Sequence, residues 1–97
     1  NVNATIAPAL VGKTFASLEA LDEALLQMDG TPTKSKLGAN AILGVSMAYV
    51  RAVSIATETP TFRLLAEIYG SEGVTLPVPM MNILNGGKHA DNGLAIQ

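Results

Sequence analysis

The sequence of 97 residues contains no cysteine and no tryptophan, and charged residues make up only 14% of it. Without cysteine the chain has neither a disulfide framework nor a thiolate metal site, which fits a protein of the cytoplasm. The net charge is -2, with no run of basic residues, so nothing resembles the basic surface that nucleic-acid binding requires. We therefore expect a cytoplasmic protein that does not bind nucleic acid.

Long hydrophobic runs are also missing, although hydrophobic residues make up 48% of the sequence. No apolar run approaches the about 20 residues that span a bilayer, and no signal peptide is visible, so we expect no membrane association. This composition is too apolar and too weakly charged for a disordered segment. The chain opens on Asn1 without a Met and closes on the apolar run Leu94-Ala95-Ile96 and Gln97, with no turn residue to end it. Both features favour a segment of a longer protein, or the ordered part of one.

The first half of the chain contains one clear helical pattern. In residues 17–28, Leu and Met side chains recur at helical spacing, and Ser17 is suited to cap the first turn. Gly30 suits the left-handed residue that follows a helix. Before this helix, residues 2–11 predict one or two turns, whose start is limited by Pro8.

Two further helices are predicted in the middle of the chain. Residues 37–57 are small or apolar nearly all round, which predicts a helix that is buried on several sides. Gly44 lowers helix propensity there by about 1 kcal/mol relative to Ala, so we expect it to allow close contact with a neighbouring backbone. The next helix is predicted to begin at Thr59-Pro60, with Pro60 in the first helical position, and to end at Gly70.

The last part of the chain has a different pattern. Residues 76–84 carry two prolines near their start and then an apolar stretch, which favours an extended strand over a helix. Asn85-Gly86-Gly87 is typical of a turn, and a second strand is predicted from Leu94 onward. The predicted fold is therefore mainly α, with a β-hairpin at the C-terminus.

The loop between these predicted strands is the candidate functional site. Residues 85–93 combine three glycines, Lys88, the single histidine His89 and the carboxylate of Asp91. Glycines leave backbone N–H groups accessible, and Lys88 and His89 could face an anion. The alternative is a flexible surface hairpin in which His89 is solvated and Asp91 merely forms the turn. No second histidine or carboxylate pair completes a metal site here.

Residues 29–36, DGTPTKSK, superficially resemble a phosphate-binding loop. They lack the spacing of the glycine-rich phosphate loop and do not follow a predicted strand. A connector between two helices is the better interpretation.

Several stretches, taken together and in order, resemble enolase. The two longest are DGTPTKSKLGANAILGVSMA at residues 29–48 and LPVPMMNILNGGKHADNGLAIQ at residues 76–97. NATIAPAL at residues 3–10 and TPTFRLLA at residues 59–66 also match the family at corresponding places. Each motif alone is modest evidence, but the ordered set is specific. Tyr49 is bulkier than the small residue expected there, which could alter the local packing.

The resemblance implies an internal segment of a two-domain enzyme. Residues 1–73 would be the helical second half of an α+β N-terminal domain. Residues 74–97 would be a linker and the first strands of a (β/α)8-type barrel, whose first two strands pair antiparallel in this family. Barrel enzymes keep their chemistry at the mouth where the predicted loop would lie.

The resemblance also implies an activity: Mg2+-dependent dehydration of 2-phosphoglycerate to phosphoenolpyruvate in glycolysis, by an enzyme that is a homodimer. His89 matches the histidine of the loop that closes over the substrate, and Gln97 matches a glutamine that contacts it. The other loop positions that match are Gly86, Gly87, Lys88, Ala90 and Asp91. The metal-binding carboxylates, the Lys base and the principal Glu acid would follow Gln97, so we expect the segment alone to be inactive.

A different class of function remains open. The helical apolar content of residues 17–70 is also compatible with a stand-alone, non-catalytic interaction module. Such a module would be monodisperse and fold cooperatively at this length, whereas a segment that has lost its packing partners would be molten or aggregated.

Overall fold

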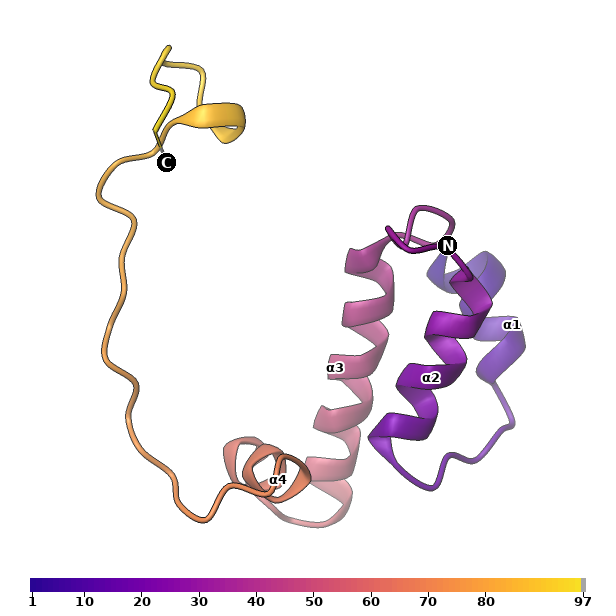
Figure 1. Cartoon of the computed structure of the whole chain (residues 1–97). Coiled ribbons are helices and arrows are strands. Elements are labelled where there is room, and N and C mark those ends of the chain that lie inside the picture. The colour runs from indigo at the N-terminus through magenta and orange to yellow at the C-terminus, as the bar shows by residue number, and fades with distance from the viewer. Residues whose placement is uncertain (97) are drawn as a thin grey trace.

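A computed structural model describes residues 1–96 and, at His89, the backbone alone. Helices α2 and α3 lie side by side, α4 lies across the end of α3, and the chain then leaves the helices as a long extended segment (Figure 1). The elements in chain order are a π-helical turn Val2–Ile6, α1 Ala7–Leu10, α2 Leu18–Asp29, α3 Ala39–Ala56, α4 Thr61–Ile68 and a 3-10 turn Gly87–His89.

Helix α2 confirms the pattern found in residues 17–28. The hydroxyl of Ser17 accepts a hydrogen bond from the backbone N–H of Ala20 at 3.2 Å, which caps the first turn. Gly30 has a left-handed backbone with φ of 69°, and its N–H donates to the carbonyl of Leu26. A residue with a side chain is strained at this φ, so glycine ends the helix at little cost.

The connector between α2 and α3 is organised by the carboxylate of Asp29, which is only 3% exposed. Oδ1 accepts hydrogen bonds from the N–H and hydroxyl of Thr31, and Oδ2 accepts from the N–H of Leu37 at 2.7 Å. Burial raises the pKa of Asp29, but hydrogen bonds from Thr31, Leu37 and Lys36 outweigh it and hold the pKa below its ordinary value. The interpretation of this segment as a helix connector fits this geometry.

Helix α3 forms where the sequence predicts it, but the rest of the described chain does not cover it on several sides. Of its residues, all of which the structure describes, Val50 alone is buried. Leu43 and Met47 are each 59% exposed and Ile55 is 76% exposed. A Cβ added to Gly44 would meet no described atom within 4 Å, so the expected close contact at Gly44 is absent from the described part of the chain. The prediction of a helix buried on several sides is therefore wrong for this chain.

By length and composition alone, α3 could span a membrane, because its 18 residues have a mean hydropathy of 1.4. The expectation that no apolar stretch reaches this length is thus wrong. A core helix of a water-soluble domain meets the same test, so length and composition do not distinguish the two.

Helix α4 begins one residue later than predicted. Pro60 is the residue before the helix rather than its first helical residue, and Thr61 starts it. The corner between α3 and α4 is held by side chains: the Ser54 hydroxyl donates to the carbonyl of Thr59 at 2.6 Å, and the Thr61 hydroxyl donates to that of Ser54 at 3.1 Å.

The core is small and lies between the N-terminal turns, α2 and the start of α3. Its buried hydrophobic members are Ile6, Leu21, Leu25 and Leu37. Tyr49 packs against this cluster and its hydroxyl donates to the carbonyl of Phe15 at 3.3 Å, so the larger side chain is accommodated. The radius of gyration is 17.4 Å, well above the about 13 Å of a compact domain of this length.

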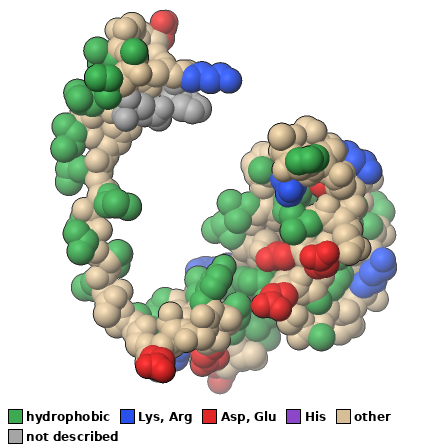
Figure 2. All heavy atoms as spheres, in the orientation of Figure 1, with side chains coloured by type: hydrophobic (Ala, Val, Ile, Leu, Met, Phe, Trp, Pro, Cys, Tyr) green, Lys and Arg blue, Asp and Glu red, His purple; other side chains and the backbone are tan. Residues whose placement is uncertain are grey.

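The predicted C-terminal β-hairpin is wrong. Residues 71–96 contain no strand, and residues 71–85 are exposed throughout. Hydrophobic side chains project along this extended segment without cover (Figure 2). A strand is defined by hydrogen bonds to a partner strand, and Pro77 and Pro79 have no N–H to donate. The apolar pattern therefore led to a strand prediction that fails because the described residues supply no partner strand.

Candidate functional site

Residues 85–96 fold back on themselves at the far end of the extended segment (Figure 1). The N–H of Gly87 donates to the carbonyl of Leu94 at 2.7 Å. The side-chain N–H of Asn92 donates to the carbonyl of Asn85, also at 2.7 Å. These two bonds close the base of a loop at the place where the sequence predicts a turn. One backbone bond does not make a strand ladder, and therefore the loop is closed without a hairpin.

Gly86 is the position at which the returning chain approaches most closely. It is buried, and a Cβ built on it would lie 2.2 Å from the backbone carbonyl oxygen of Ile96 and 2.8 Å from the Cβ of Leu94. No real Cβ is found that close to a backbone atom, so any side chain here would push the two arms apart. Position 86 therefore requires glycine, because there is no room for a side chain.

Gly87 is required for a different reason, which is its backbone conformation. Its φ is 66°, in the left-handed region where other residues are strained. The backbone then enters the 3-10 turn Gly87–His89 and becomes extended at Ala90. Together the two glycines let the chain reverse direction and present the turn beyond the closed base.

The other predicted site residues lie on this turn or just after it. Lys88 and Asp91 are exposed, and Ala90 is half-buried. His89 is the last residue of the 3-10 turn, and its side chain lies outside what the structure describes. Gln97 lies outside the described residues. The structure thus brings Gly86 and Gly87 against the arm at Leu94, and it leaves the cationic Lys88 open to solvent.

Sequence reasoning missed the part that Asn92 plays. Its Oδ1 accepts from the N–H of Leu94 at 3.2 Å while its Nδ2 bonds Asn85, so one side chain fixes both arms of the loop. The bond with Leu94 could have been predicted from the sequence, because Asn side chains readily bond the backbone two residues on. The bond to Asn85 was not predictable, because it depends on how far the loop folds back.

The sequence resemblance implies Mg2+, and the described residues offer no site for this ion. Among residues 1–96, with the His89 side chain set aside, no three Asp, Glu, His or Cys side chains are close enough together to hold a metal. Mg2+ is bound through carboxylates together with water and substrate phosphates, and the loop offers the single carboxylate of Asp91. These residues alone do not fit a metal site.

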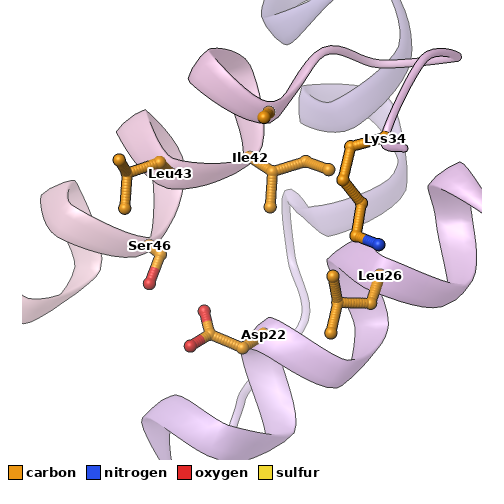
Figure 3. A pocket seen from close by; sticks show the side chains of 7 residues that line it. Asp22, Leu26, Lys34, Ile42, Leu43 and Ser46 are labelled. Atoms are coloured by element: carbon orange, nitrogen blue, oxygen red, sulfur yellow. The ribbon is translucent and has the colours of Figure 1, made fainter. Parts of the chain in front are cut away.

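A second candidate is a groove of about 220 Å3 between α2 and α3. Asp22 and Ser46 point toward each other across it, and the amine of Lys34 lies near Leu26 (Figure 3). Oδ1 of Asp22 is buried and has no hydrogen-bond partner in the described part of the chain. The remaining lining is apolar, namely Leu26, Ala39, Ile42 and Leu43. Such a lining suits helix packing better than a reaction.

Comparison with known proteins identifies the class to which this helical segment and closed loop belong. Residues 1–65 match the family model described as "Enolase, N-terminal domain". Residues 73–97 match the model described as "Enolase, C-terminal TIM barrel domain". Because the first match covers more than half of the chain, the chain belongs to the enolase family. The predicted boundary between residues 73 and 74 stays a prediction.

Individual relatives agree with this assignment. The chain is 50% identical over 97 residues to Enolase 1 of Entamoeba histolytica, a match that covers all of this chain and 22% of that protein. It is 54% identical over 92 residues to the enolase of Kineococcus radiotolerans, covering 95% of this chain and 21% of that protein. The chain thus spans about a fifth of the length of these relatives. No solved structure matches it.

Proposed function

We propose that the protein to which this chain contributes is an enolase, a lyase that dehydrates 2-phosphoglycerate to phosphoenolpyruvate in glycolysis. The observation that carries this proposal is the pair of family matches, which follow one another along the chain in the order N-terminal domain and then barrel. Relatives at 50% and 54% identity that are themselves named enolase support it.

Within that enzyme, we propose that the loop at residues 85–96 closes over the substrate. Its base is held by the Gly87–Leu94 and Asn92–Asn85 hydrogen bonds, so the turn between them is held at both ends. Lys88 is exposed on that turn and carries the charge that an anionic phosphoglycerate would meet. His89 and Gln97 are proposed to contact the substrate, on the strength of the NGGKHADN and AIQ sequences.

The same family assignment supports further proposals for the whole enzyme: a Mg2+ cofactor, a homodimer and a cytoplasmic location, with no role for nucleic acid or membrane. The metal would be held by residues outside this chain, because the described residues do not fit it. Helix α3 falls within the match to the N-terminal domain, which favours packing inside that domain over insertion in a bilayer.

The loop proposal is tested by steady-state kinetics on the full-length protein that contains this chain. Gly86→Ala should lower kcat/KM by about 100-fold, because the added Cβ displaces the arm of the loop and a shift of about 1 Å at a site costs this much. His89→Ala should lower it as well. Gly73→Ala is the matched control, because a Cβ at Gly73 meets no described atom within 4 Å.

Activity of Gly86→Ala equal to that of the Gly73→Ala control would overturn the role of the loop. Absence of any turnover of 2-phosphoglycerate by the unaltered full-length protein would overturn the enzymatic assignment itself. The two failures are therefore distinguishable.

A further inference from the structure

The closed loop contains the dipeptide Asn-Gly twice, at Asn85-Gly86 and at Asn92-Gly93. An asparagine followed by glycine is open to an intramolecular reaction in which the next backbone nitrogen attacks the side-chain amide. Glycine favours this attack because it has no Cβ to hinder the approach and because its backbone turns freely. The same chemistry is therefore available at two places only a few residues apart.

The two asparagines differ in how their side chains are held. Asn92 is hydrogen-bonded through both ends of its amide, at 2.7 Å to the carbonyl of Asn85 and at 3.2 Å from the N–H of Leu94. Asn85 is exposed, and its Oδ1 accepts one long bond of 3.3 Å from the equally exposed Asn82. Among the described residues, the Gly86 N–H donates to no acceptor that would hold it back from attack.

We propose that Asn85 is a site of spontaneous deamidation and that the loop itself protects Asn92. The backbone nitrogen of Gly86 loses its proton to hydroxide and forms a bond to Cγ of Asn85. The bond from Cγ to Nδ2 breaks, and the amide nitrogen takes a proton from water and leaves as ammonia, which regenerates hydroxide and gives a cyclic succinimide. Water then opens either carbonyl of the ring and leaves aspartate or isoaspartate at position 85, with no oxidant or cofactor required.

The product does not fit the closed loop. Isoaspartate lengthens the backbone by one methylene directly before Gly86, where even a single added Cβ would lie 2.2 Å from the carbonyl oxygen of Ile96. The Gly87–Leu94 hydrogen bond at 2.7 Å is then lost and the arms separate. A new negative charge would also oppose an anionic substrate; that consequence rests on the proposed function, whereas the modification does not.

The test uses ageing of the full-length protein that contains this chain in mildly alkaline buffer, followed by tryptic digestion and mass spectrometry. Cleavage after Arg63 and Lys88 places the two sites in different peptides, residues 64–88 with Asn85 and a peptide that begins at residue 89 with Asn92. We expect the mass gain of amide hydrolysis to accumulate about tenfold faster at Asn85 in the folded protein, a difference of about 1.4 kcal/mol in barrier. Fragment ions separate Asn85 from Asn82 within the first peptide.

The same ageing in denaturant is the control, because it removes the hydrogen bonds of Asn92 and leaves the sequence unchanged. There the two rates should converge. Asn85→Gln should abolish the gain in the first peptide, since the longer side chain cyclises poorly. Equal rates in the folded state or a faster reaction at Asn92 would overturn the proposal. So would an Asn85 that reacts in denaturant but not in the folded state.

Discussion

Asp29 shows at the scale of one residue how a single side chain positions two helices. The sequence predicts a connector at residues 29–36, and local rules predict that Gly30 ends α2. That the carboxylate would accept the N–H of Leu37, eight residues away, does not follow, because it depends on how the connector turns back. Local signals predicted the boundary, and packing decided the hydrogen bonds.

This network predicts a loss of stability in acid. The pKa of Asp29 lies below its ordinary value of 3.8 in the folded chain. Its contribution is therefore complete above about pH 3.8, the ordinary value, and is lost as the pH falls through the lower, folded pKa. The helix content followed by circular dichroism should decline in this window for the unaltered chain. Asp29→Asn should be less stable at neutral pH and lose this part of the pH dependence.

Glu23 offers a matched control for Asp29 on the same helix. Its carboxylate is exposed and accepts one bond from Gln27 at 3.1 Å, an interaction that solvent largely replaces. Glu23→Gln should leave both the stability and the acid profile nearly unchanged. An acid profile for Asp29→Asn identical to that of the unaltered chain would contradict the role of the network.

At the scale of the element, the helices were predictable and the strands were not. Helices α2, α3 and α4 follow from spacing, caps and glycines within about twenty residues of sequence, and each was located to within two residues at its start. A strand needs a partner, and the described residues supply none for residues 76–84. The loop was correctly placed because its glycines act locally, whereas its closure by Asn92 was missed.

Replacing Gly38 or Gly44 by Ala is predicted to change the stability of the chain in opposite directions. Gly38, just before the helix, has φ of 95°, so Gly38→Ala should destabilise the chain by about 1–2 kcal/mol through backbone strain. Gly44 lies within the helix and an added Cβ meets no described atom within 4 Å. Gly44→Ala should therefore stabilise this chain by about 1 kcal/mol through helix propensity. The helix content of the short chain, followed by circular dichroism as denaturant is added, should fall earlier for Gly38→Ala and later for Gly44→Ala.

Gly44→Ala also gives a prediction for the full-length protein. If α3 packs inside an enolase N-terminal domain, as the family match favours, a neighbouring backbone should approach Gly44 there. Gly44→Ala is then expected to destabilise the full-length protein while it stabilises the short chain. Stabilisation in both would contradict close packing at this position.

The whole molecule is too open for a self-sufficient domain. Its radius of gyration of 17.4 Å and its small core of Ile6, Leu21, Leu25 and Leu37 leave α3, α4 and the extended segment with uncovered apolar side chains. Exposed apolar surface of this kind marks a binding face or a liability to aggregation. The structure locates this uncovered apolar surface on α3, α4 and residues 74–84.

This openness separates the two classes of function that the sequence left open. The 97-residue chain should bind an apolar dye such as ANS and self-associate in size-exclusion chromatography, because its apolar surface has no cover. A stand-alone interaction module would instead elute as one monodisperse species with a cooperative unfolding transition. The second outcome would reopen the module hypothesis, which the family match now disfavours.

The most direct measurement is the appearance of phosphoenolpyruvate from 2-phosphoglycerate and Mg2+, followed by its ultraviolet absorbance, for the 97-residue chain and for the full-length protein in parallel. We predict turnover by the full-length protein and none by the chain, whose described residues hold no metal site and whose loop at residues 85–96 supplies only part of a substrate site. Turnover by the chain alone, or none by the full-length protein, would contradict this account.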